Sequence, residues 1–109
     1  MGVIRKVRIH GFNVNSVEWN LYFFNLKDHI LIQGEEDMQE GDLIVLREMA
    51  LYAEEQESRF LVLEIENVDP QMSSIICENL LELKLRKPKP LKQSERANLK
   101  KFYKTGFRD

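Results

Sequence analysis

Three consecutive residues, Lys27, Asp28 and His29, carry the side-chain types of a nucleophile, a general base and a general acid. A lysine acts as a nucleophile or base only when burial or a neighbouring cation lowers its pKa. Adjacent side chains of a strand point to opposite faces, so Asp28 and His29 meet only if they lie at a turn. We therefore interpret the histidine as a surface or capping residue and do not expect an enzyme.

Residues that hold metals, phosphates or disulfides are too sparse for a cofactor site. His10 and His29 do not stand at the spacing of a known metal motif. Cys77 is the single cysteine, which excludes an internal disulfide, and it follows two isoleucines, so it should pack as a small apolar side chain. The five glycines form no phosphate-binding loop. The sequence therefore predicts neither a metal nor a cofactor.

The basic residues offer a different chemistry, because they are concentrated at one end of the chain. Residues 1–83 carry six basic and sixteen acidic residues, a net charge of −10, whereas residues 84–109 carry ten basic and two acidic residues, a net charge of +8. A concentrated positive field attracts phosphates or an acidic surface, unless the basic segment folds back and neutralises its own acidic body. The predicted phosphate contacts are Lys27, Arg47, Lys84, Arg86, Lys87, Lys89, Lys92, Arg96, Lys100, Lys101 and Lys104.

Two kinds of partner fit this charge distribution. A nucleic acid would bind with an affinity that falls steeply with salt, and Trp19, Tyr22 and Tyr52 are candidate platforms for base stacking, although the first two also suit a protein core. The alternative is a small adaptor or inhibitor that binds a protein through the basic segment or through the acidic clusters 35–37 and 54–57, which would imitate a phosphate backbone. Neither partner is a membrane.

One globular domain must position these residues, because the chain has 109 residues, of which 43% are hydrophobic. No apolar run approaches the roughly 18 residues that a membrane span requires. Charged residues within 1–8 interrupt the apolar stretch that a secretion signal needs, so we expect a cytoplasmic protein.

The segment 17–26 decides which fold is expected. Asn15, with Glu18 three residues later, is a candidate N-cap. The aromatic content of the segment would also suit a strand, but its spacing favours a helix. The residues that recur at helical spacing on one stripe are Trp19, Tyr22, Phe23 and Leu26.

Strands are predicted on both sides of this segment. Residues 3–9 mix branched apolar and basic residues, as an edge strand does, and His10-Gly11 should end it. Residues 30–32 form a short apolar run that ends at Gly34. After a turn at Gly41-Asp42, residues 43–46 are apolar throughout, which suits a strand buried on both faces.

The second half of the domain shows alternating patterns. Residues 60–68 alternate apolar and acidic side chains, which predicts a strand with one wet face that Asp69-Pro70 stops. A helical turn is expected at 71–78. Residues 81–86 alternate in the same way and predict the last strand.

The chain divides after this strand into a domain, 1–86, and a basic extension, 87–109. Pro88 and Pro90 make the start of the extension stiff. A short amphipathic helix should follow with Ser94 as its N-cap, and its apolar face holds Leu99, Phe102 and Tyr103.

These elements predict a mainly β, α+β architecture: a small closed β barrel with one early helix and a basic helical extension. Two barrels compete. In an OB-fold barrel the segment 17–26 would be a strand, whereas in a PUA-like barrel it would be a helix over the barrel mouth.

Several motifs stand in the order found in a known family. They are HGFNV from His10, Glu18-Trp19, the segment 27–33, EGDLIVLRE from Glu40 and RFLVLEIENV from Arg59. In these motifs the sequence resembles the ASCH branch of the PUA-like superfamily, above all small ASCH-like proteins of phages and bacteria. The likeness covers residues 10–85 and is most specific from Gly41 to Glu48. It implies a PUA-like barrel that binds nucleic acid, with RNA favoured over DNA.

The departures from the family imply that this activity is not catalytic. The family's glycine, acidic residue and arginine fall at Leu26, Leu31 and Gln33. Some ASCH proteins are amidohydrolases that use a lysine and a threonine on acetylated cytidine. Asp28 takes the place of that lysine, and Leu31 also takes the place of the threonine. A shift of one residue restores Lys27 but not the hydroxyl.

Overall fold

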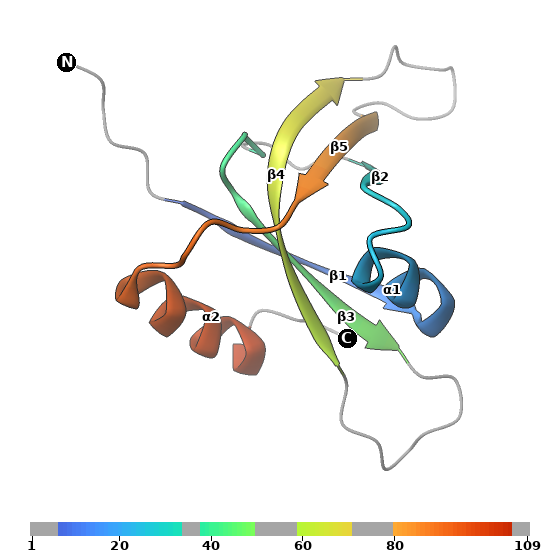
Figure 1. Ribbon diagram of the computed structural model, residues 1–109. Helices are drawn as coiled ribbons and strands as arrows, with labels where there is room; N and C mark the ends of the chain where they lie inside the picture. The colour runs from blue at the N-terminus through green and yellow to red at the C-terminus, as the bar shows by residue number, and fades with distance from the viewer. Residues whose placement is uncertain (1–6, 34–37, 50–58, 71–79, 106–109) are drawn as a thin grey trace, which may run out of the picture.

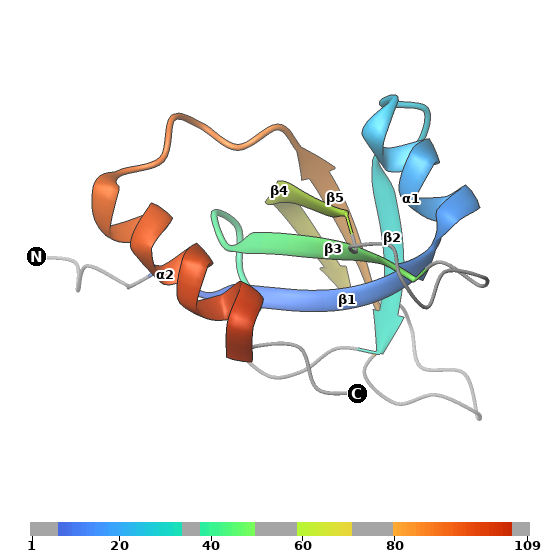
Figure 2. The same ribbon diagram turned by 90° about the horizontal axis from the view of Figure 1, so that it is seen from below.

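A computed structural model describes residues 7–33, 38–49, 59–70 and 80–105. The sheet that these residues form is curled into a half-barrel, and the described structure is mostly β, as the sequence predicts (Figures 1 and 2). Neither of the helices in these ranges is long and apolar enough to cross a bilayer. The elements are β1 (Ile9–Asn15), α1 (Ser16–Phe23), β2 (His29–Gln33), β3 (Leu43–Met49), β4 (Phe60–Pro70), β5 (Leu80–Arg86) and α2 (Gln93–Thr105).

The five strands form one sheet in the order β1-β3-β4-β5-β2. β1 pairs with β3 in parallel, and the other neighbours are antiparallel. A parallel pair needs a long connection, and α1 together with β2 supplies it. Among the described strands, β1 and β2 are the two edges of the sheet.

The first strand lies further along the chain than the sequence predicts. It runs from Ile9 to Asn15 rather than over residues 3–9, so His10 and Gly11 lie inside it instead of ending it. Residues 1–6 are outside the described ranges. The buried carboxylate of Asp42 anchors the start of β1, because it accepts from the backbone N–H of Arg8 at 3.2 Å and contacts Nε2 of His10 at 3.0 Å. Because Asp42 is more than thirty residues away in sequence, the residues around Ile9 do not themselves indicate where the strand begins.

The helix predicted for 17–26 is confirmed, but it is shorter and buries less. The side chain of Asn15 caps α1 by accepting from the N–H of Glu18 at 2.8 Å. Asn25 adopts a left-handed φ of 58°, which turns the chain away after Phe23. Leu26 therefore lies outside the helix and is exposed, so it is not part of the predicted buried stripe.

The strand predicted to be buried on both faces is confirmed in β3. Ile44 and Leu46 point to the inner face of the curled sheet and pack against α1. Leu43 and Val45 point to the outer face, where Leu99 of α2 covers them. The alternation along one strand therefore separates two cores.

β4 departs from its prediction in two ways. The strand continues through Asp69 and Pro70, which pair with β5, because a proline at the last position of a strand has no ladder hydrogen bond to donate. Glu64, expected on a wet face, is 8% exposed and pairs with Arg86 of β5 at 2.5 Å. β5 agrees with its prediction.

The C-terminal helix forms as predicted, but its first turn is capped differently. α2 begins at Gln93, so Ser94 lies inside the first turn and is not the N-cap. The carboxylate of Glu95 instead accepts from the N–H of Lys92 at 3.0 Å, as the second half of a capping box does. The helical turn expected at 71–78, with Cys77, lies outside the described residues.

Candidate nucleic-acid interface

The predicted contacts on the sheet are engaged with acidic or polar neighbours. Lys27 donates to Glu18 at 3.0 Å, and Lys84 lies 3.5 Å from Glu66. Arg86 is bound to Glu64, and this hydrogen bond raises the pKa of its guanidinium. A phosphate would have to displace a carboxylate from each of these cations, which weakens them as binding residues.

Arg47 is the remaining predicted contact on the sheet. Its Nε donates to Oδ1 of Asn13 at 2.7 Å. The two residues are opposite each other in the parallel register of β1 and β3. This bond ties the Arg47 side chain to the neighbouring strand, β1.

The cations of the extension are arranged differently. Apart from Lys101, which has a partner, their side chains form no ion pair with any residue in the described ranges. All of them are exposed. They are Lys87, Lys89, Lys92, Arg96, Lys100, Lys101 and Lys104, and with Glu95 they give residues 87–104 a net charge of +6.

Three of these cations form a row along α2. Arg96, Lys100 and Lys104 stand at i, i+4 and i+8, so they share one flank of the helix at steps of about 6 Å. The helix docks through the neighbouring face, where Leu99 is 5% exposed and Tyr103 contacts Phe60 with ring centroids 4.7 Å apart. Docking therefore turns the row towards solvent.

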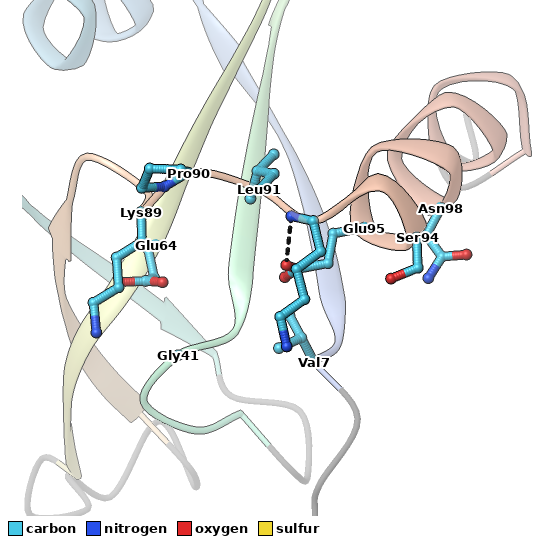
Figure 3. Close-up of a pocket in the computed structure, with 10 residues that line it drawn as sticks. Val7, Gly41, Glu64, Lys89, Pro90, Leu91, Ser94, Glu95 and Asn98 are labelled. Carbon is cyan, nitrogen blue, oxygen red and sulfur yellow. Dashed lines mark hydrogen bonds between the residues drawn. The ribbon is translucent and has the colours of Figure 1, made fainter.

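Residues 87–92 form a connector between β5 and α2. A cleft of about 570 Å³ lies between the sheet on one side and the connector and the start of α2 on the other (Figure 3). Lys89 and Lys92 line it on the connector side, and Glu64 and Glu95 contribute carboxylates. Glu64 is neutralised by Arg86, and Glu95 is occupied by the N–H of Lys92. Neither carboxylate forms an ion pair with Lys89 or Lys92 in the described structure, so the positive surface of α2 continues along the connector.

The Lys27-Asp28-His29 segment leads from α1 into β2, and each of its side chains contacts an ionisable neighbour. The hydrogen bond to Glu18 is the main cause that raises the pKa of Lys27, which is opposite to the shift that activates a lysine nucleophile. Asp28 and His29 do meet, with Oδ1 and Nδ1 2.5 Å apart, because they lie where the loop enters β2. Across the described ranges, no three His, Cys, Asp or Glu side chains could share a metal ion.

The aromatic residues expected to stack on bases are placed in the core. Trp19 and Tyr22 are 3% and 4% exposed, so they cannot serve as platforms, and Tyr52 lies outside the described residues. Phe23 and Phe24, which the sequence did not single out for this role, are instead 51% and 64% exposed. The sequence signal that could have identified them is that two aromatic residues are adjacent near the end of the predicted helix, where both cannot face the core.

A scan against protein-family models and a search of curated proteins found no match to this chain.

Proposed function

We propose that this protein is a non-catalytic module that binds nucleic acid, RNA in preference to DNA, through its phosphate backbone. The observation that carries the proposal is the row of Arg96, Lys100 and Lys104 on α2, whose charges have no acidic partner in the described ranges. Cations of this kind release the counterions of a polyanion without first losing a salt bridge. The connector extends the same field.

The acidic body supports this choice of surface. Its net charge of −10 repels a polyanion, so an approaching strand is steered to the end of the molecule that carries the extension. The paired cations Lys27, Lys84 and Arg86 change this field little, because each is matched by a carboxylate. An adaptor would bind a protein through the acidic clusters 35–37 and 54–57 or through the basic segment, and the two clusters are outside the described ranges.

We also propose that the curled sheet is a PUA-like barrel of the ASCH type. The helical segment between the first two strands supports this fold over an OB-fold barrel, where a strand is expected. The turn at Gly41, with its φ of 92°, leads directly into β3, as the Gly-Asp motif of the family implies. The resemblance to RNA-binding folds is the reason for placing RNA ahead of DNA.

The test compares two double variants with the same change in charge. Lys100→Gln/Lys104→Gln removes two free cations, whereas Lys27→Gln/Lys84→Gln removes two paired ones. Fluorescence anisotropy with a labelled oligouridylate of a dozen nucleotides, titrated at several salt concentrations, measures both affinity and its salt dependence. The α2 variant should lower the slope of log K against log salt by about 1.4, two single-strand phosphate contacts, and the sheet variant should leave it nearly unchanged.

Two results would overturn the proposal. One is a wild-type protein that retains no oligonucleotide at low salt. The other is an equal loss of slope in the two double variants, which would mean that the row on α2 has no special role. An oligodeoxyuridylate of the same length, run in parallel, tests the preference for RNA.

A further inference from the structure

An exposed aromatic pair stands at the end of α1. The ring of Phe23 stacks on Trp19, with centroids 5.0 Å apart and an angle of 14° between the ring planes. Phe24 meets Phe23 edge-on at 5.1 Å. Trp19 is held in turn by the guanidinium of Arg59, 4.1 Å from its centroid. Phe23 is therefore the outer layer of a fixed stack, although half of its surface is open to solvent.

Phe23 lies beside the first residue of the basic connector, Lys87. A small cleft of about 80 Å³ beside α1 is lined by Phe23 together with Lys27, Arg86 and Lys87. Lys87 is the first residue of the connector, and the connector runs from the end of β5, next to α1, across to the start of α2 (Figure 2). The aromatic pair and the row on α2 are thus the two ends of one continuous path.

We infer that the ring of Phe23, with Phe24 standing edge-on beside it, forms a stacking platform for an unpaired base of a single-stranded nucleic acid, whose backbone follows the connector from Lys87 to α2. The inference rests on the proposed function and specifies its ligand. Aromatic rings stack on any base that is exposed, and a duplex hides its bases, so a platform of this kind selects single strands. The ring of Phe23 is already held flat, so little conformational freedom is lost on binding.

The charges around the pair favour this occupant over a second copy of the chain. Two copies joined through this surface would bring Lys87 of one molecule close to Lys87 of the other, and no ion pair with a described residue offsets either charge. A nucleic acid instead offers a flat ring for the aromatic pair and a phosphate for Lys87. Asp28, which also lines the cleft, is bound to His29.

The experiment separates stacking from phosphate contacts by removing bases from the probe. Oligouridylate and an abasic oligomer of the same length are titrated against the wild-type protein, Phe23→Leu/Phe24→Leu and Lys100→Gln/Lys104→Gln. The wild type should bind the oligouridylate about tenfold more tightly than the abasic oligomer. The phenylalanine variant should lose that preference and keep its salt slope, whereas the lysine variant should keep the preference and lose part of the slope.

Folding is checked in the same samples. Far-UV circular dichroism and the urea midpoint report whether the fold is intact, because Phe23→Leu changes the surroundings of Trp19 directly and alters its emission even in a folded protein. Phe24→Leu alone, at the more exposed position, is the fallback if the double variant does not fold, and about half of the preference should then be lost.

Three outcomes would overturn the inference. Equal affinity of the wild type for the two probes removes stacking but leaves phosphate binding intact, so the proposed function survives. No binding of either probe removes both. A wild-type dimer in sedimentation that Phe24→Leu dissociates would assign the aromatic pair to self-association.

Discussion

The two helices lie against opposite faces of β3, and they are held there in different ways. α1 docks with two side-chain hydrogen bonds to the sheet, from Nε1 of Trp19 to the carbonyl of Leu46 at 3.1 Å and from the hydroxyl of Tyr22 to the carbonyl of His29 at 2.8 Å. Among the α2 side chains whose burial is described, Leu99 alone is buried, with Phe102 and Tyr103 half-buried beside it. The first helix is part of the core, and the second is attached to its surface.

The cations near the two helices also differ, because those near α1 are paired with carboxylates and those in the row on α2 are not. Lys27, next to α1, is matched by Glu18, and Arg59 above Trp19 is matched by Glu48. The row on α2 faces solvent with no such partners in the described ranges. The contrast teaches that charge near the inner core is paired across the fold, while the row on α2 is left open to solvent.

The largest expected effect is at the inner core. Trp19→Ala should lower the free energy of unfolding by about 3–5 kcal/mol, because it removes the stack with Phe23 and leaves a cavity under α1. Urea unfolding followed by circular dichroism measures the change, since the variant has no tryptophan. Val17→Ala, on the exposed side of the same helix, is the control and should stay within about 0.5 kcal/mol. A loss below 1 kcal/mol for Trp19→Ala would contradict a core role for α1.

The outer core should yield a smaller and more local effect. Leu99→Ala should lower the free energy of unfolding by about 2 kcal/mol, at the low end for a buried leucine because few side chains surround it. Amide hydrogen exchange should show α2 losing protection while α1 keeps it. If both helices lose protection together, α2 is as much part of the core as α1.

Each helix has one tyrosine whose hydroxyl can be removed by substitution with phenylalanine, so the stability effects of Tyr22 in α1 and Tyr103 in α2 can be compared directly. Tyr22→Phe should lower the free energy of unfolding by about 1 kcal/mol, because it removes the hydrogen bond to the carbonyl of His29. Tyr103→Phe should have almost no effect, since its hydroxyl bonds to no residue within the described ranges. Burial raises the pKa of both hydroxyls, so burial alone does not distinguish them. Equal losses in chemical denaturation would remove the distinction.

The smallest effect is in the acid range. The hydrogen bond from Arg59 lowers the pKa of Glu48 below its ordinary value of 4.5. A depressed carboxyl pKa stabilises the fold above about pH 4.5, and this stabilisation disappears as the pH falls through the lowered value. Arg59→Gln should therefore reduce the acid dependence of the urea midpoint, whereas Arg96→Gln on α2 should leave it as in the wild type. Identical acid profiles of the three proteins would refute the role of the pair.

Local patterns were enough to predict most of the elements. Asn15 with Glu18 indicates a helix start, and four apolar residues from Leu43 indicate a strand buried on both faces. Both signals act within a few residues. The first strand was misplaced because its anchor, Asp42, is more than thirty residues away in sequence. A propensity for extended structure in residues 3–9 says nothing about which residues pair with β3.

The candidate site was predictable only in part. Charge asymmetry pointed to the extension, and α2 presents its cations there, but the sequence could not distinguish them from Lys27, Lys84 and Arg86. Which cation is neutralised depends on the carboxylate across the sheet, as Glu64 is for Arg86. The same holds for the aromatic residues, because Trp19 is buried against β3, a strand more than twenty residues away in sequence, where its Nε1 donates to the carbonyl of Leu46.

The sequence by itself determined the kinds of elements, the position of α1 and α2, and the separation of acidic and basic residues, since each is a property of neighbours along the chain. Only the tertiary structure decided the strand order with its parallel β1–β3 pair, the pairing of the sheet cations and the exposure of Phe23 and Phe24. The reason is physical: hydrogen bonds and ion pairs act over a few ångströms, and folding brings residues from distant parts of the chain within that range.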